Sequence, residues 1–151
     1  MKLFIRLIFS FILLLWCTLI FIDWIIPFNE NVIVVVPIIK KTFSLVCHQQ
    51  EYKLISQNVF HSMVCSRCAG IYTGAFIASL ALLFFTIKKK FGNRLFYFAV
   101  IPMLADIFCY TLNIYEYSKP VAFATGLLLG STGFLYFYSA VNQFIIEKRV
   151  K

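Results

Sequence analysis

Four long apolar runs alternate with short polar segments along this chain. They cover residues 7–28, 68–87, 95–115 and 121–146, and each is close to the roughly 20 residues that a helix needs to cross a bilayer. The pattern predicts an all-α integral membrane protein with four transmembrane helices, folded as a single membrane domain over residues 1–151. The lipid bilayer is then its first partner.

The composition strengthens this prediction. Hydrophobic residues make up 62% of the sequence and charged residues 13%, whereas a soluble domain has roughly half apolar and a quarter charged residues. The net charge of +8 would suggest nucleic acid in a soluble protein. Here the basic residues stand at the ends of apolar runs, where they report topology, so we expect no nucleic-acid partner.

Counting these basic residues predicts the orientation. Nine would lie on the side that holds both termini and the link between the second and third runs: Lys2, Arg6, Lys88, Lys89, Lys90, Arg94, Lys148, Arg149 and Lys151. Five would lie on the opposite side: Lys40, Lys41, Lys53, Arg67 and Lys119. The positive-inside rule then places both termini in the cytoplasm, in a multi-pass protein of the bacterial inner membrane whose first run is an uncleaved anchor.

The loop of residues 29–67 would be extracytoplasmic, and it holds most of the candidate chemistry. It contains "CHQQ" at Cys47 to Gln50, then His61, and it ends in "CSRC" at Cys65 to Cys68. A C-x-x-C pair is a common two-ligand unit of thiolate zinc sites. The spacing therefore predicts a transition-metal site, zinc first, with Cys47, Cys65 and Cys68 as ligands and His48, or else His61, as the fourth.

Other functions remain open for the same residues. A C-x-x-C pair at a helix N-terminus beside Arg67 favours the thiolate, so an alternative is a membrane thiol-disulfide oxidoreductase, which could exchange electrons with a quinone. The thiols could equally form a plain disulfide staple or be inert. A non-catalytic accessory subunit of a membrane complex, or a homo-oligomer, is a third class. The sequence leaves open whether the chain is an enzyme.

A polar face on the third run adds a buried acid to the picture. Asp106, Cys109 and Asn113 follow helical spacing, and an acid within lipid is a functional candidate by default. Counted from Leu95, Asp106 lies roughly 16 Å into its helix. We expect it to join Arg67 in one polar network beneath the cysteines, with Asn113, Cys109 or water as a bridge. The alternative is a hydrogen bond from Thr125 or Tyr72 that only packs the helices.

Several motifs together carry a family resemblance. "CHQ", "CSRCAGIYTG", "IPMLAD" and "ATGLLLG" resemble a bacterial and archaeal membrane family, domain of unknown function 2085 (DUF2085). The resemblance implies a site but no activity. The chain departs from the family pattern at Lys53, because the family usually has an Arg-Ser or similar pair a few residues after CHQ. It places motif residues at Cys47, His48, Gln49, Cys65, Arg67, Cys68, Gly70, Tyr72, Gly74, Asp106, Thr125 and Gly126.

Overall fold

The computed structural model describes residues 3–28, 33–57, 60–85 and 93–150. The elements along the chain are α1 (Leu3–Ile20), η1 (Ile22–Phe28), α2 (Val36–Phe43), η3 (Glu51–Lys53), β1 (Leu54–Gln57), β2 (Phe60–Cys65), α3 (Ser66–Phe84), α4 (Asn93–Thr111) and α5 (Lys119–Val150). Five basic residues of the topology count lie outside the described residues: Lys2, Lys88, Lys89, Lys90 and Lys151.

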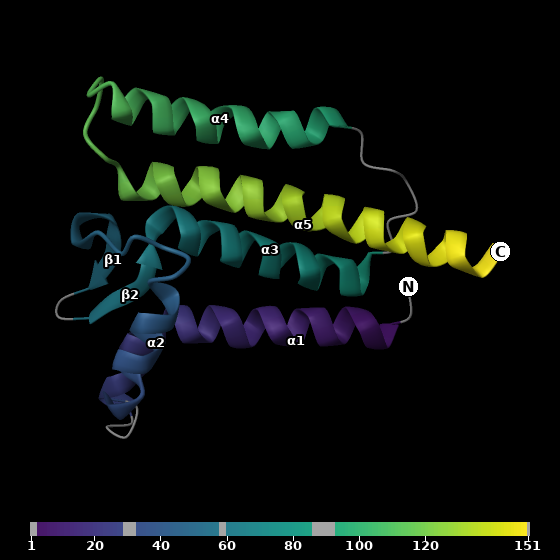
Figure 1. Cartoon of the computed structure of the whole chain (residues 1–151), viewed down its shortest axis with the longest axis horizontal. Helices are drawn as coiled ribbons and strands as arrows, with labels where there is room; N and C mark the ends of the chain where they lie inside the picture. Colours follow the sequence, from purple (N-terminus) through teal and green to yellow (C-terminus); the bar gives the residue numbers. More distant parts are fainter. Residues whose placement is uncertain (1–2, 29–32, 58–59, 86–92, 151) are drawn as a thin grey trace.

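The four long helices lie side by side in the order α4, α5, α3 and α1 (Figure 1). Both chain termini lie at one end of this row. The opposite end carries α2, the two strands and the connection between α4 and α5, and we call it the sheet end. The most extensive packing in the row is between α3 and α5, with α1 against α3 and α4 against α5.

Glycines explain why α3 and α5 approach so closely. A Cβ atom added to Gly70 would overlap the carbonyl oxygen of Phe123, and one added to Gly126 would overlap that of Arg67. Gly74 and Gly130 meet the partner backbone in the same way. In contrast, a Cβ on Gly133 would meet nothing within 4 Å. The small residues therefore serve helix packing, as they do in many membrane bundles.

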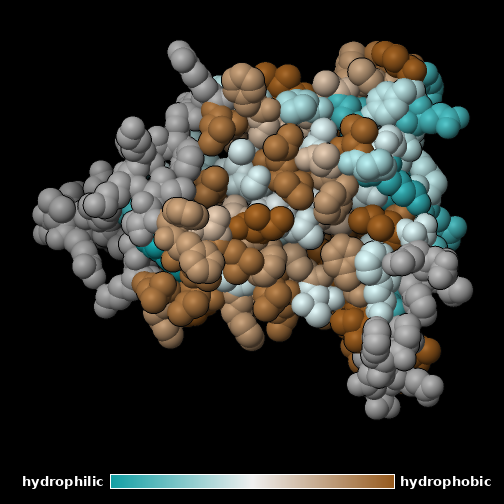
Figure 2. Space-filling model, turned by 180° about the vertical axis from the view of Figure 1, so that it is seen from behind, coloured by the Kyte–Doolittle hydropathy of each residue, from teal (hydrophilic) through white to brown (hydrophobic). Residues whose placement is uncertain are grey.

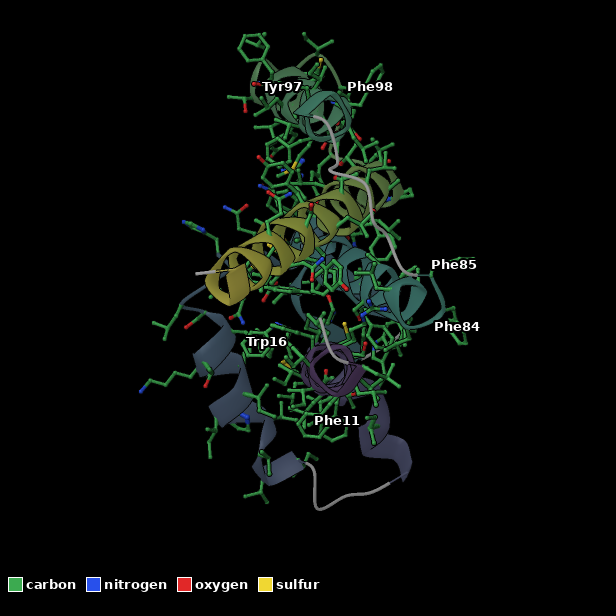
Figure 3. All side chains as sticks on the ribbon, turned by 90° about the vertical axis from the view of Figure 1, so that its right-hand side faces the viewer. Phe11, Trp16, Phe84, Phe85, Tyr97 and Phe98 are labelled. Atoms are coloured by element: carbon green, nitrogen blue, oxygen red, sulfur yellow. The ribbon has the colours of Figure 1, made fainter. Side chains whose placement is uncertain are left out.

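The surface of the row suits lipid. Three described helices are long and apolar enough to cross a membrane, namely Leu3–Ile20, Ser66–Phe84 and Lys119–Gln143, and a shorter apolar helix covers Leu95–Thr111. Phe84, Phe85, Tyr97 and Phe98 point away from the helices (Figure 3) and are 58–83% exposed. Figure 2 shows apolar residues across the middle of the row and polar residues gathered at the sheet end.

The observed helices match the four predicted spans only approximately, and two of them end earlier for reasons that the structure shows. The first helix ends at Ile20, and residues Ile22–Phe28 form a 3-10 helix instead of a continuation. There the Asp23 carboxylate accepts a hydrogen bond from the backbone N–H of His61 at 3.0 Å, which joins this turn to β2.

The third helix ends at Thr111 rather than at residue 115. Asn113 has a left-handed φ of 55°. The N–H groups of Asn113 and Ile114 bond back to the carbonyls of Tyr110 and Cys109, both at 3.0 Å. This is the Schellman arrangement that closes a helix C-terminus.

The all-α prediction is wrong for part of the loop between α1 and α3. Strands β1 and β2 form an antiparallel hairpin in which Ser56 pairs with His61 and Leu54 with Cys65. Met63 and Val64 of β2 are buried against α1 and α3. The "VIVVVPII" run is partly helical, with Pro37 in the first turn of α2, where its missing N–H costs nothing.

Candidate metal centre

Three cysteines meet at the sheet end of the row. The sulfur atoms of Cys47, Cys65 and Cys68 all lie within 4.8 Å of one another, and none is in a disulfide. Cys47 follows α2, Cys65 ends β2 and is the N-cap of α3, and Cys68 lies in the first turn of α3. The fold thus brings together two motifs that are 18 residues apart in sequence.

Gln49 fixes the turn that presents Cys47. Its backbone has a left-handed φ of 46°, which reverses the chain directly after Cys47 and His48. Its side-chain amide donates hydrogen bonds to the carbonyls of Lys40 at 3.0 Å and Met63 at 2.8 Å. These two bonds tie the turn to α2 on one side and to β2 on the other.

The Cys47 sulfur also accepts a hydrogen bond from the backbone. The N–H of Cys65 lies 3.2 Å from it. Backbone N–H groups directed at sulfur stabilise negative charge there, and hydrogen bonds of this kind tune thiolate metal sites.

Hydrogen bonding within the cluster separates the acidities of the thiols. Hydrogen bonds from the side chains of Cys65 and Cys68 hold the pKa of the Cys47 thiol well below its usual range. The same contact with Cys47 raises the pKa of the Cys65 thiol. Without a cation, the first negative charge therefore belongs on Cys47.

An apolar layer supports the cluster from the side of α1. Cys47 is buried together with Ile20, Phe43 and Val64. The Trp16 ring lies 5.1 Å from that of Phe43 and 5.8 Å from that of Tyr72, centroid to centroid. Tyr72 of α3 therefore packs against Trp16 of α1, beside the site.

The two histidines lie apart from the three sulfurs. His48 is exposed and lines the same surface hollow as the cysteines, but it is not in the cluster in which all ligand atoms lie within 4.8 Å. His61 is exposed on β2 and lines a different hollow with Lys40, Glu51 and Asp23. Their assignment as ligands stays a prediction.

A buried ion pair lies next to the cluster. The Arg67 guanidinium pairs directly with the Asp106 carboxylate, which joins the start of α3 to α4. The Tyr115 hydroxyl donates to the other oxygen of Asp106. The two charged side chains are 18% and 3% exposed.

The sequence predicted a bridged contact between Arg67 and Asp106, whereas the structure has a direct ion pair. Because α4 ends at Thr111, Asp106 lies only five residues, about 8 Å, from the sheet end of its helix. Measured along the helix from that end, Asp106 is shallow enough for the Arg67 side chain to reach it. No bridging residue or water is therefore needed.

The other residues expected in this network have different roles. The Thr125 hydroxyl donates to the carbonyls of Val121 and Ala122 in its own helix. Asn113 is exposed and closes α4, and Cys109 is half-buried. Tyr115, which does contact Asp106, was missed because the sequence placed it at the end of a helix that in fact stops earlier.

An open hollow of about 340 Å³ lies over the cysteines. Besides the three thiols, its wall includes His48, Lys53, Arg67 and Tyr117. Burial raises the pKa of Tyr117 to about 12, so its hydroxyl stays neutral. No sequence pattern pointed to Tyr117, which lies in the tyrosine-rich connection after α4.

The chain matches the model of a known protein family. The family model described as "Predicted membrane protein (DUF2085)" matches residues 47–136, a range that begins at Cys47 and includes Cys65, Cys68 and Asp106. No solved structure matches the chain.

Two relatives are archaeal proteins. An uncharacterized protein of Methanocaldococcus jannaschii is 34% identical over 113 residues, which cover 70% of this chain and 70% of the relative. An uncharacterized protein of Methanothermobacter thermautotrophicus is 33% identical over 89 residues, covering 58% of this chain and 80% of the relative. These relatives give no support to a specifically bacterial inner membrane, but with the family match they show that the chain belongs to the DUF2085 family of predicted membrane proteins.

Proposed function

We propose that this membrane protein binds one thiophilic transition-metal ion, zinc in the first instance, through Cys47, Cys65 and Cys68. The observation that carries the proposal is the set of three free sulfurs within 4.8 Å of one another. Tetrahedral zinc with Zn–S bonds of about 2.3 Å separates its sulfurs by roughly 3.8 Å. A small inward movement of the three side chains would therefore bring them to that spacing.

Three thiolates leave one position of a tetrahedral ion open. His48 lines the same hollow, and among the described residues that line it His48 is the remaining side chain of a type that commonly binds zinc. If a smaller ligand fills it instead, the site would resemble metal centres that keep one position for an exchangeable ligand. Soft thiolate donors favour zinc and monovalent copper over the hard cations.

We further propose that this site lies on the extracytoplasmic side. Both termini lie at the end of the row opposite to β2 and the start of α3 (Figure 1), where Cys65 and Cys68 stand, as expected for an even number of crossings. The nine-to-five distribution of basic residues assigns that end to the cytoplasm.

Thiol-disulfide exchange is a second candidate function. Cys47 lies close to both members of the Cys65–Cys68 pair, so it could attack a disulfide between them. Such a reaction needs the thiolate, which hydrogen bonds favour at Cys47. An external thiol or disulfide would then exchange electrons with the pair.

Cobalt titration of variants that each lack one cysteine tests the metal proposal. Reduced protein in detergent should bind one Co(II) per chain and show a sulfur-to-cobalt charge-transfer band. We expect Cys47→Ser, Cys65→Ser and Cys68→Ser each to weaken or abolish this band. Cys17→Ser and Cys109→Ser serve as matched controls, since neither residue is in the cluster. Equal titrations for all five variants would refute the site.

A further inference from the structure

The hollow over the cysteines is basic on one side. Lys53 and Arg67 line it, with His48 beside them, and none of its described lining residues is acidic. Arg67 already has Asp106 as its counter-ion. Apart from the cysteine sulfurs, the described residues that line the hollow offer Lys53 no anionic group.

Three tyrosines hold the Lys53 ammonium group in place. Its nitrogen lies 5.1 Å from the ring centroid of Tyr52, 4.9 Å from that of Tyr110 and 5.6 Å from that of Tyr117. The Tyr52 and Tyr110 hydroxyls are hydrogen-bonded at 2.8 Å, which closes one side of this tyrosine cage. Within the described part of the chain, Lys53 pairs with no carboxylate. A cation–π cage orients an ammonium group but leaves its charge unneutralised.

Two further hydrogen-bond donors in the same wall lack partners. The Nε of Arg67 and the hydroxyl of Tyr117 are both buried, and neither makes a hydrogen bond in the structure. Buried polar groups without partners are exceptions in native proteins and call for an explanation. Both residues line the hollow, so an acceptor bound there could satisfy them after a small side-chain movement.

We infer that the hollow binds a small organic anion that carries a thiolate and a carboxylate. Its thiolate would occupy the fourth position of the metal, and its carboxylate would contact Lys53, with Arg67 Nε and Tyr117 Oη as additional donors. This inference rests on the proposed metal site. It gives Lys53 a carboxylate partner, which the described part of the chain does not supply.

Three small thiols whose tails are anionic, neutral or cationic test the inference. Cobalt-loaded wild-type protein is titrated anaerobically with 3-mercaptopropionate, 2-mercaptoethanol and 2-mercaptoethylamine, and the ligand-field bands report entry into the fourth position. We expect mercaptopropionate to bind about tenfold more tightly than mercaptoethanol, the effect of one charge-assisted contact. Mercaptoethylamine should bind most weakly.

Substitutions of Lys53 test whether this residue causes the preference for mercaptopropionate. Lys53→Met should remove it, and Lys53→Arg should retain it, because arginine keeps the charge and also stacks on tyrosine. Lys41→Met is the matched control, since Lys41 is exposed on α2 and outside the hollow. An unchanged cobalt spectrum before thiol is added shows that each variant keeps the cysteine cluster.

The outcomes separate this inference from the metal proposal. If cobalt does not bind to the wild-type cysteines at all, the metal site fails first. If cobalt binds but the three thiols bind equally well, or if Lys53→Met keeps the preference for mercaptopropionate, the anion site is overturned and the metal site stands.

Discussion

Arg67, one residue before Cys68, forms an ion pair with Asp106 of α4, so the helix that begins at the cysteine cluster is fastened to α4 by a nearly buried carboxylate. The helices α3 and α4 are otherwise separated in the row by α5 (Figure 1). The pair thus links the end of α3 that carries the cysteine cluster to a helix that α3 hardly contacts elsewhere.

Replacing only one residue of this ion pair should destabilise the protein more than replacing both residues together. Asp106→Asn and Arg67→Gln each leave one partner without its counter-charge, and we expect each to cost about 1–3 kcal/mol. This is below the 3–5 kcal/mol that is typical of fully buried pairs, because Arg67 is partly exposed. The double variant should lose clearly less than the sum of the two single variants. Unfolding in detergent measures all three, and strictly additive losses would argue against coupling.

The glycines of α3 and α5 should be intolerant of even one methyl group. Gly70→Ala and Gly126→Ala would push a Cβ into the backbone of the facing helix. We expect losses of about 1–3 kcal/mol for each, typical of overpacking. Gly133→Ala is the control, because its Cβ would meet open space and alanine favours the helix. If all three variants unfold alike, the close approach of α3 and α5 is wrong.

Gln49 should position Cys47 without binding the metal. Gln49→Ala loses both hydrogen bonds to the Lys40 and Met63 carbonyls and strains the left-handed backbone. Gln49→Gly loses the same bonds but accommodates the backbone. We expect metal affinity to fall about 10- to 100-fold in the alanine variant, as for other residues that orient ligands, and less in the glycine variant. Competition with a chromophoric chelator gives both affinities; wild-type affinity in both variants would remove Gln49 from the site.

The orientation can be read from reporter fusions. A periplasm-active reporter fused after Lys151 should be silent, and one inserted at Asn58, between β1 and β2 in the sequence, should be active. A cytoplasm-active reporter at the same two positions should give the opposite pattern. Activity of the first reporter at Lys151 alone would place the cysteines in the cytoplasm.

The helical architecture could be predicted from sequence because it depends on local hydrophobic length. Apolar runs of about 20 residues report membrane helices regardless of what they pack against. The hairpin of β1 and β2 could not be predicted in this way. Its strands are only four and six residues long, and the hydrogen bond from Ile55 to Ser62 forms only when the two strands are paired, while the burial of Met63 and Val64 depends on the helices.

The grouping of three thiols at the candidate site could be predicted from sequence, whereas most of their surroundings could not. Cys65 and Cys68 share one helix turn, and Cys47 was the other thiol in the same loop, so three residues followed from spacing alone. The direct Arg67–Asp106 pair was not expected, because the end of α4 was placed four residues too far along the chain. The tyrosine cage brings Tyr110 and Tyr117 to Lys53, more than 50 residues away, which only the fold determines.

The central claim, that Cys47, Cys65 and Cys68 hold one metal ion, is tested most directly by native mass spectrometry of protein purified without oxygen or chelator. The account predicts a mass equal to that of the reduced chain plus one transition-metal ion, less the protons that the ligating thiols release, and a return to the reduced-chain mass when the ion is removed with acid. A metal-free chain whose mass is about two daltons below the reduced value, restored by a reductant, would show a disulfide in its place and contradict the account.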